Sequence, residues 1–380
     1  MKKLKLAVLL SVVSFGLRAE TVDTIAIEKY RHDFLNGNHK IVDFVMNLYE
    51  KYDIVILGER DHRDTTQYSF IKDIVADCRF IDNVGYVYTE VGCNTATKSA
   101  NGLIKSKFNS EEEFRLAAIK HLRVEDWWPL WEKWNRYKLL RDLSVINDSL
   151  SAERKLTIGL TDVNYPWNDI GSPADFKCLY EEAQWNRDYI MSQNFSYMYF
   201  HQRPRNGKRK ALLITNAPHA INNPLTKNEG WFIKQGFGDR VAIVLMNWDK
   251  WWQDEYELWD DGRVDAAFYM TGNKPVALKM DECAIGDLMM EGLHFKDVAD
   301  AVVFDVPVDR FVCKCGLDGL ITTDFEEEIL RRDRIVGEAI YPDRKPSSIE
   351  GLYQEYNRER CFSPYSDTVL HQFRRFIEDR

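Results

Sequence analysis

The feature that most constrains the fold is a rhythm of short apolar runs that alternate with longer stretches of helical periodicity. The runs are rich in valine, isoleucine and leucine, and they cover residues 53–59, 85–92, 155–163, 210–220, 240–248 and 300–307. Near-continuous apolar runs suit strands that are covered on both faces. Because helices alternate with these strands, the sequence predicts an α/β fold with a mostly parallel central sheet flanked by helices.

Long helical stretches interrupt this rhythm. Apolar residues spaced three and four apart predict helices over 26–51, 65–78, 110–150 and 174–202. Ser110, followed by Glu113, has the pattern of a capping box that opens the third of them. We therefore expect a long helical insertion, at about 94–150 and 165–202, over one edge of the sheet.

The ends of the chain differ in character from its middle. Residues 1–19 begin with lysines, continue with an apolar run and end at Ala19, which is the layout of a secretory signal peptide. This leader predicts an exported protein, periplasmic or secreted. Residues 20–310 are expected to form the α/β domain, and the charged residues 311–380 an extension packed on it.

Composition excludes several kinds of partner. The net charge of −9 is spread along the chain without a long basic run, so nucleic acid is a poor partner. No apolar run after the leader reaches the roughly 18 residues that a membrane span requires. Seven cysteines are too sparse for a disulfide scaffold in 380 residues, and their pairing stays open, as does the oligomeric state. Four tryptophans crowd into one segment, where they either pack a helix or wall an apolar or sugar-like ligand: Trp127, Trp128, Trp131 and Trp134.

Polar residues follow or end four of the predicted strands. In an open α/β sheet, ligands bind in the crevice beyond the carboxyl ends of the strands. The candidates there are Glu59 and His62, Glu90, Asp162 and Asn164, and Asn216 and His219. One polar strand end is ordinary, but four of them predict a site.

His62 is the sharpest of these candidates. A histidine just past a core strand and close to carboxylates suits a general base near neutral pH, although it could equally be a loop histidine bonded to Asp61 or Asp64. Glu59 and Glu90 lie after or within apolar runs, where a carboxylate needs a partner or a cavity. A structural ion pair is the alternative for both.

Two further residues are weaker candidates on their own. His219 follows Pro218, which favours a break in the strand just before it, and the alternative is a helix start capped by Asn216. Arg187 lies in a predicted helix, where an ion pair with a neighbouring carboxylate such as Asp188 is the ordinary explanation. Common catalytic motifs, including the G-x-S-x-G elbow, the P-loop and H-E-x-x-H, do not occur.

Together these residues resemble the signature of the erythromycin esterase family, within the wider TraB/Tiki-type and ChaN-like superfamily. The similar segments, in order, are ILGERDHRD, TEVG, WWPLWEKWNRYKLLRDLSVIN with KLTIGLTDV, NRDYIMSQNFSYMYF and LLITNAPHA. Order and spacing agree over roughly residues 50–310. The chain departs from the esterases in the RDH and NAPH segments, where they have a small residue pair and no proline.

The resemblance implies a polar cleft in which the catalytic residues are Glu59, His62, Glu90, Arg187 and His219. It implies an exported hydrolase that takes a small-molecule substrate and activates water to cleave an ester or lactone, with no cofactor required. Two alternatives stay open. One is a Tiki-type peptidase with a divalent metal on Glu59, His62, Glu90 and His219, and the other is a ChaN-like haem-binding protein with His62 or His219 as axial ligand.

Overall fold

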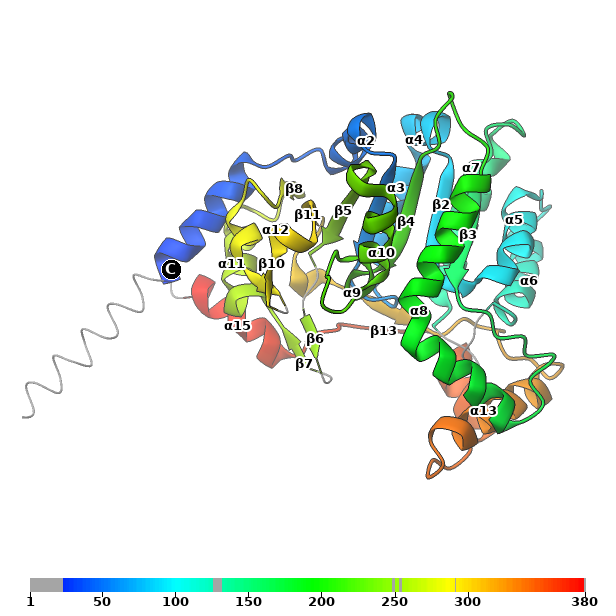
Figure 1. Ribbon diagram of the computed structural model, residues 1–380. Helices are drawn as coiled ribbons and strands as arrows, with labels where there is room; N and C mark the ends of the chain where they lie inside the picture. Colours follow the sequence, from blue (N-terminus) through cyan, green and yellow to red (C-terminus); the bar gives the residue numbers. More distant parts are fainter. Residues whose placement is uncertain (1–22, 126–131, 248–249, 253–254, 291, 379–380) are drawn as a thin grey trace, which may run out of the picture.

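The computed structural model describes residues 23–125, 132–247, 250–252, 255–290 and 292–378. Its centre is a seven-stranded sheet (Figure 1) with the strand order β3-β2-β4-β1-β5-β11-β8. The strands are β1 (Ile54–Glu59), β2 (Tyr86–Cys93), β3 (Thr157–Asp162), β4 (Ala211–Asn216), β5 (Val241–Met246), β8 (Val276–Lys279) and β11 (Ala301–Phe304). All neighbours pair in parallel except β8, which runs antiparallel to β11. The predicted α/β fold with a mostly parallel sheet is confirmed.

Alternation along the strands divides the core into two layers. In β1, Val55 and Leu57 face one layer while Ile54 and Ile56 face the other, and all four are fully buried. Side chains of successive strand residues point to opposite faces, so a strand buried on both sides needs apolar residues at every position. This requirement explains why the strand read as a continuous apolar run.

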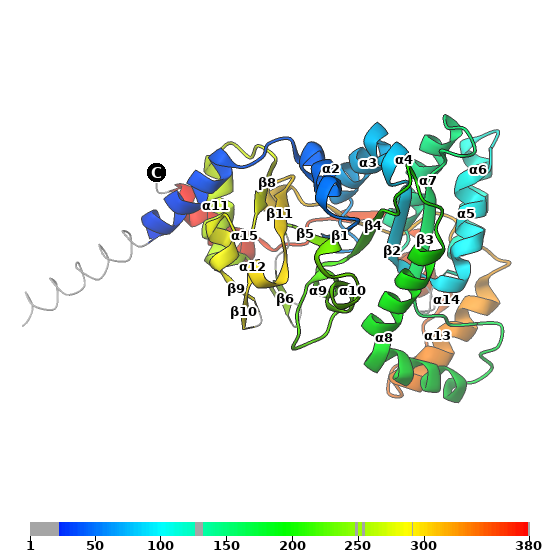
Figure 2. The same ribbon diagram turned by 45° about the horizontal axis from the view of Figure 1, so that its top comes forward.

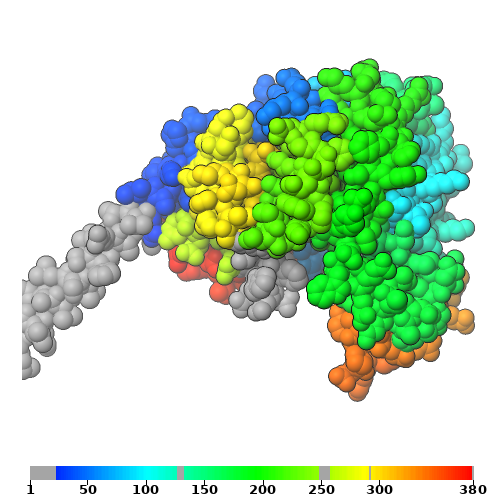
Figure 3. All heavy atoms as spheres, in the orientation of Figure 1, coloured from blue at the N-terminus to red at the C-terminus, as the bar shows by residue number. Residues whose placement is uncertain are grey.

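Helices cover both faces of the sheet. One face carries α2 (Ile41–Lys51), α3 (Gln67–Ala76), α5 (Thr97–Lys105), α6 (Glu111–Leu122) and α7 (Trp134–Asp148). The other carries a helix over 23–36, the C-terminal part of α8 (Pro173–His201), α10 (Glu229–Phe237) and α11 (Arg263–Met270). The turned view separates these two layers (Figure 2), and α8 and α10 make up much of the green surface on one face of the molecule (Figure 3).

Two predicted helices differ from the observed ones, and one observed strand was not predicted. The helix expected over 26–51 is two helices, because the chain leaves helical geometry at Gly37 and Asn38 to pair with Ala277 at the free edge of β8. A Cβ at Gly37 would lie 2.4 Å from the side chain of Val276, so this approach needs glycine. The stretch 110–150 contains α6 and α7 as separate helices. Strand β8 was not predicted, since its four residues are too few to stand out as an apolar run.

The chain beyond residue 310 packs at two places. Helix α13 (Glu326–Ile340) lies against the N-terminal half of α8, where Ile335 and Val336 join a buried aromatic cluster around Phe176. Helix α15 (Asp367–Glu378) packs on α11 near the opposite end of the molecule (Figure 1), burying Phe373.

Other predictions have separate outcomes. The signal peptide and three of the four clustered tryptophans lie outside the described residues, while Trp134 packs against the core beside Tyr137. All seven cysteines are free thiols. Within the described residues, no helix is both long and apolar enough to span a membrane.

Candidate active site

The carboxyl ends of β1, β2, β3 and β4 place polar side chains side by side. Glu59 and Asn216 occupy matching register positions at the ends of β1 and β4, and Cys93 at the end of β2 matches Asp162 at the end of β3. Side chains from α8 and from the short helix α9 (Ala217–Ala220) reach the same region. The carboxyl edge of the sheet therefore gathers polar residues from four strands and two helices.

The loop after β1 is held in one shape by hydrogen bonds. Gln67 accepts from the backbone of Arg60 at 2.9 Å and donates to the carbonyl of Asp61 at 2.7 Å, which closes the loop onto α3. Asn135 of α7 donates to the carbonyl of His62 at 2.8 Å. These bonds fix the backbone on both sides of His62, and hence the direction of its ring.

Arg60 anchors the same loop from below. Its guanidinium is buried, pairs with Asp64 and Asp305, donates to Asn247 at 2.7 Å and lies 4.0 Å from the ring centre of Phe311. Every cation buried this deeply requires such partners. Arg60 therefore links the carboxyl ends of β1, β5 and β11. Its side chain bonds Asp64, Asp305 and Asn247 and none of the five candidate catalytic residues.

His62 bridges two buried carboxylates. Its Nδ1 hydrogen-bonds Glu59, and its Nε2 lies 3.5 Å from Oε1 of Glu90. Tyr68 donates to the other oxygen of Glu59 at 3.2 Å. Burial alone would lower the pKa of His62, but the charges of Glu90 and Glu59 outweigh it and hold that pKa well above its usual value. The ring is thus held between two carboxylates of β1 and β2, whereas the loop alternative named Asp61 or Asp64 as its partner.

Glu90 is the hub of the site. Its Oε2 accepts from the Thr215 hydroxyl at 3.0 Å and from the backbone of Asn216 at 2.8 Å. Its Oε1 accepts from Arg187 at 2.9 Å. Burial would raise the pKa of Glu90, yet the cations around it, foremost His219 and His62, hold that pKa well below its usual range. Glu90 is thus an anion that organises the groups around it.

Arg187 reaches this hub from α8. It donates through Nε and Nη2 to the two oxygens of Asp162, both at 2.9 Å, and its Nη1 lies 3.1 Å from Nε2 of His219. A bidentate pair of this kind fixes the guanidinium plane. Arg187 does make ion pairs, as its ordinary explanation expected, and they reach Asp162 and Glu90 on two strands of the sheet.

His219 is held between α8 and β2. Its Nδ1 lies 2.8 Å from Asp188, and its Nε2 lies 3.4 Å from Oε1 of Glu90. Burial lowers the pKa of His219, but Glu90 and Asp188 together raise it above the usual value. Asp188 also accepts the backbone N–H of Glu229, at 2.7 Å, so it links His219 to the start of α10.

The structure brings all five predicted residues together: Glu59, His62, Glu90, Arg187 and His219. Asp162 and Asn216 join them, whereas the side chain of Asn164 turns to the backbone of Thr95. Sequence reasoning missed the supporting set of Tyr68, Asn135, Asp188, Thr215 and Glu229. Asp188 directly follows Arg187 and was considered only as its partner, and nothing in the local pattern marked the others.

Exposure separates the histidines from the carboxylates. The side chains of His62 and His219 are 14% and 23% exposed, and that of Arg187 is 13% exposed. Glu59, Glu90 and Asp162 are buried behind them. The imidazoles and the guanidinium are therefore the groups that solvent can reach, while the three carboxylates contact them from the interior.

The residues do not fit a divalent metal. A metal on Glu59, His62, Glu90 and His219 would compete with the Arg187 guanidinium, which already bonds Glu90 in the centre of that set. Among the described side chains, no group of three or more histidines, cysteines, aspartates or glutamates is arranged to hold an ion. An additional positive charge beside a fixed guanidinium is electrostatically unfavourable.

The same residues do not fit haem as axial ligands either. An axial histidine needs a ring nitrogen that points into an apolar cavity. Both nitrogens of His62, and both of His219, lie within 3.5 Å of charged side chains. No step of the chemistry is therefore assigned to a metal or to haem.

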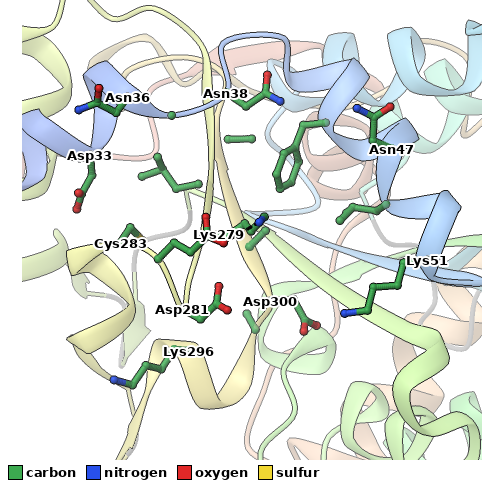
Figure 4. A pocket seen from close by; sticks show the side chains of 18 of the residues that line it. Asp33, Asn36, Asn38, Asn47, Lys51, Lys279, Asp281, Cys283, Lys296 and Asp300 are labelled. Atoms are coloured by element: carbon green, nitrogen blue, oxygen red, sulfur yellow. Dashed lines mark hydrogen bonds and ion pairs between the residues drawn. The ribbon is translucent and has the colours of Figure 1, made fainter.

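A separate cavity of about 880 Å³ lies at the opposite, amino-terminal edge of the strands. Asp33, Lys51, Lys279, Lys296 and Asp300 are among its charged residues, and Lys51 and Lys296 lie at two sides of it (Figure 4). The charges pair locally rather than converge: Lys279 with Glu282 at 2.7 Å, and Lys296 with Asp287 at 2.8 Å. The size of this cavity is therefore not evidence that it is the active site.

Sequence comparison gives no match, either to a protein-family model or to a curated protein. In structure, the chain is similar to a succinoglycan biosynthesis protein, with TM-score 0.50 and 9% identity over 74% of this chain and 96% of that one. A mutant of the erythromycin esterase EreC in its open conformation gives TM-score 0.46 and 12% identity, over 70% and 93%. ChaN of Campylobacter jejuni, with cofacially bound haem, gives 0.35 and 10%, over 69% and 91%.

These likenesses concern the fold. The likeness to the succinoglycan biosynthesis protein, at TM-score 0.50 and 9% identity, supports a shared fold, and none of the comparisons shows membership of the erythromycin esterase family. The function of this chain therefore depends on the residues of its own site.

Proposed function

We propose that this chain is a hydrolase that activates water with His62 to cleave an ester or lactone bond in a small molecule. The observation that carries the proposal is the convergence of two partly exposed imidazoles and a guanidinium at the carboxyl ends of the strands, with His62 and Arg187 oriented by the buried Glu59 and Asp162 and His219 by the half-buried Asp188. This arrangement has the parts of general-base catalysis: a base, its orienting group, and donors for a developing negative charge.

His62 is the proposed base. In its neutral form one ring nitrogen takes a proton from water as the water oxygen attacks the carbonyl carbon. Glu59, on Nδ1, orients the ring and stabilises the imidazolium that forms. The proton then passes to the leaving alkoxide, so no external acid or cofactor is consumed.

His219 and Arg187 are proposed to stabilise the oxyanion. With Asp188 on Nδ1, the Nε2 of His219 faces Arg187 Nη1 at 3.1 Å. A negative oxygen placed beside these two groups would receive hydrogen bonds from a charged imidazole and a guanidinium, both held in advance. Glu90 supports both histidines from behind.

The charge state of His62 sets the direction of the pH dependence. Its raised pKa means that the neutral, basic form becomes more abundant as pH rises above the usual histidine range. Turnover should therefore increase with pH through neutrality, about tenfold per pH unit while His62 is mostly protonated. A rate that falls over this range would contradict the assignment of His62 as base.

The test is a panel of ester, lactone and peptide substrates incubated with the purified protein and analysed by mass spectrometry, with and without a chelator. We expect chelator-independent cleavage of an ester or lactone. His62→Ala should lower turnover by about 10²–10⁴-fold and leave the circular dichroism spectrum unchanged. His201→Asn is the matched control, because His201 is exposed and its ring contacts only its own helix and Tyr197.

Three results would contradict the proposal. Retained activity in His62→Ala would remove the base, and activity lost on chelation would indicate a metal. No turnover on any substrate would favour ligand binding. Export also remains a prediction, to be checked by fractionating cells that express the full chain and locating the protein.

A further inference from the structure

One buried carboxyl group beside the site has no role in the mechanism above. Glu229 is the first residue of α10, and its exposed fraction is 0%. Neither of its carboxyl oxygens has a hydrogen bond of good geometry, because the nearby Thr215 hydroxyl donates to Glu90 instead. Such a group is rare, because an ionised carboxylate removed from water without partners is very unfavourable.

The neighbours of Glu229 are mostly negative. Glu90 of β2 and Asp188 of α8 both act electrostatically on its carboxyl group, and Thr215 of β4 and Arg187 of α8 act in the opposite direction. Burial is the largest influence and, with the two carboxylates, it raises the pKa of Glu229 well above its usual value. Position at a helix N-terminus favours a negative charge, but only weakly. Burial beside two anions outweighs that preference.

Glu229 is connected to the site through two bonded neighbours. Its backbone N–H donates to Asp188, which holds His219. The hydroxyl of Thr215 donates to Glu90 and also interacts with the carboxyl group of Glu229. A change in the charge of Glu229 would therefore be felt by His219 and by Glu90 together.

We propose that Glu229 is a positioning residue: as an uncharged acid packed beside Glu90 and Asp188 it keeps α10 against the contact that holds His219, and its ionisation would disturb the arrangement of His219 and Glu90. Protonated, it adds no charge to a cluster that already contains Glu59, Glu90, Asp162 and Asp188. Ionised, it repels Glu90 and Asp188 and pushes α10 away from the contact that holds His219. Only its effect on turnover rests on the proposed hydrolase function.

The first test does not need a substrate. Glu229→Gln mimics the protonated acid, and urea unfolding of variant and wild type is compared from pH 4.5 to 8.5. A group whose folded pKa is raised favours folding below its unfolded pKa, and that advantage is lost as pH rises. The ratio of the two unfolding equilibrium constants should be constant only below the unfolded pKa, about 4.3. It should then shift in favour of the variant, by up to tenfold per pH unit, until Glu229 ionises.

The control is Glu181→Gln on α8, where the carboxylate is 62% exposed and its ion pair with Lys177 lies on the surface. There the ratio should not change with pH. A flat ratio for Glu229→Gln as well, or a variant that loses stability as pH rises, would show that Glu229 is ionised and would overturn the inference. Infrared spectroscopy gives an independent reading: a carboxylic-acid carbonyl band at pH 7 that is absent from Glu229→Gln.

The second test uses turnover. Glu229→Gln should match the wild type at acidic and neutral pH and keep its activity to higher pH, because it has no proton to lose. If turnover of the variant declines at the same alkaline pH as the wild type, the positioning role is wrong. If no substrate is cleaved at all, the hydrolase proposal fails, and the stability test still decides whether Glu229 holds a proton.

Discussion

Removal of the Arg187 guanidinium is the sharpest perturbation of this site, because it leaves two buried carboxylates without their closest cation. Arg187 bonds Asp162 with two hydrogen bonds and Glu90 with one, all at 2.9 Å. Glu90 and Asp162 are both 1% exposed. Breaking a buried ion pair by deleting one partner costs about 3–5 kcal/mol, since the remaining charge is stranded. Arg187→Met keeps most of the side-chain volume and should therefore destabilise the protein by about this amount at pH 7.

The pH dependence of that loss has a definite sign. The pKa of Glu90 is depressed in the folded protein, so its ionised form contributes stability above the unfolded pKa, about 4.3, and this contribution is lost as pH falls. Burial opposes the depression, and Arg187 adds to that of His219 and His62. In Arg187→Met the pKa of Glu90 rises. The stability difference from the wild type should then be largest near pH 7 and shrink in acid, where protonation relieves the stranded charge.

Urea unfolding followed by circular dichroism measures both effects, and Arg154→Met is the matched control. Arg154 also makes short bonds to a carboxylate, Asp82, but both side chains are about half exposed. Exposed pairs of this kind contribute about 0–1 kcal/mol. If Arg187→Met cost no more than Arg154→Met, or if its cost grew in acid, the electrostatic account of the site would be refuted.

Two more predictions test the supporting structure. In Gly230→Ala the new Cβ would lie 1.8 Å from the Ala220 carbonyl oxygen, so α10 must shift and the free energy of unfolding should fall by about 3 kcal/mol in urea titrations. Gly236→Ala in the same helix has open space and should stabilise by about 0.5–1 kcal/mol, and equal effects of the two would contradict the packing. Asp188→Asn removes one of the two carboxylates that raise the pKa of His219, so histidine NMR should show that pKa lowered, and an unchanged titration would exclude this contact.

The sheet was predictable because burial on both faces leaves a recognisable record in the sequence, a continuous apolar run for each strand. Each parallel strand has to be apolar at nearly every position, and the polar residue that ends it is therefore conspicuous. Glu59 and Glu90 stood out for that reason, and the rule that parallel strands end at one edge brought them together with His219. Strand β8 left no such record, because an edge strand of four residues needs little apolar sequence.

The supporting residues were not predictable for the opposite reason. Tyr68 and Asn135 lie on helices, where polar residues are common, and their importance comes from contacts with Glu59 and with the backbone of His62. Nothing in the local sequence singled out Glu229. Only the packing of α10 against α8, α9 and β5 shows that its side chain is buried. The pattern of apolar residues along one helix or strand indicates which of its faces is buried. It does not indicate which other elements that face will contact.

The positions of the charges assign different roles to the buried Glu90 and to His62. Glu90 is fixed by bonds from Thr215, Asn216 and Arg187, and its lowered pKa keeps it ionised across the range in which a histidine can titrate. It therefore cannot exchange protons during turnover, and its contribution is to hold its neighbours. His62 is partly exposed and has a pKa raised by the same carboxylates that orient it. In the proposed hydrolase those carboxylates would strengthen His62 as a base and reduce its neutral fraction, so turnover is expected to rise on the alkaline side of neutrality.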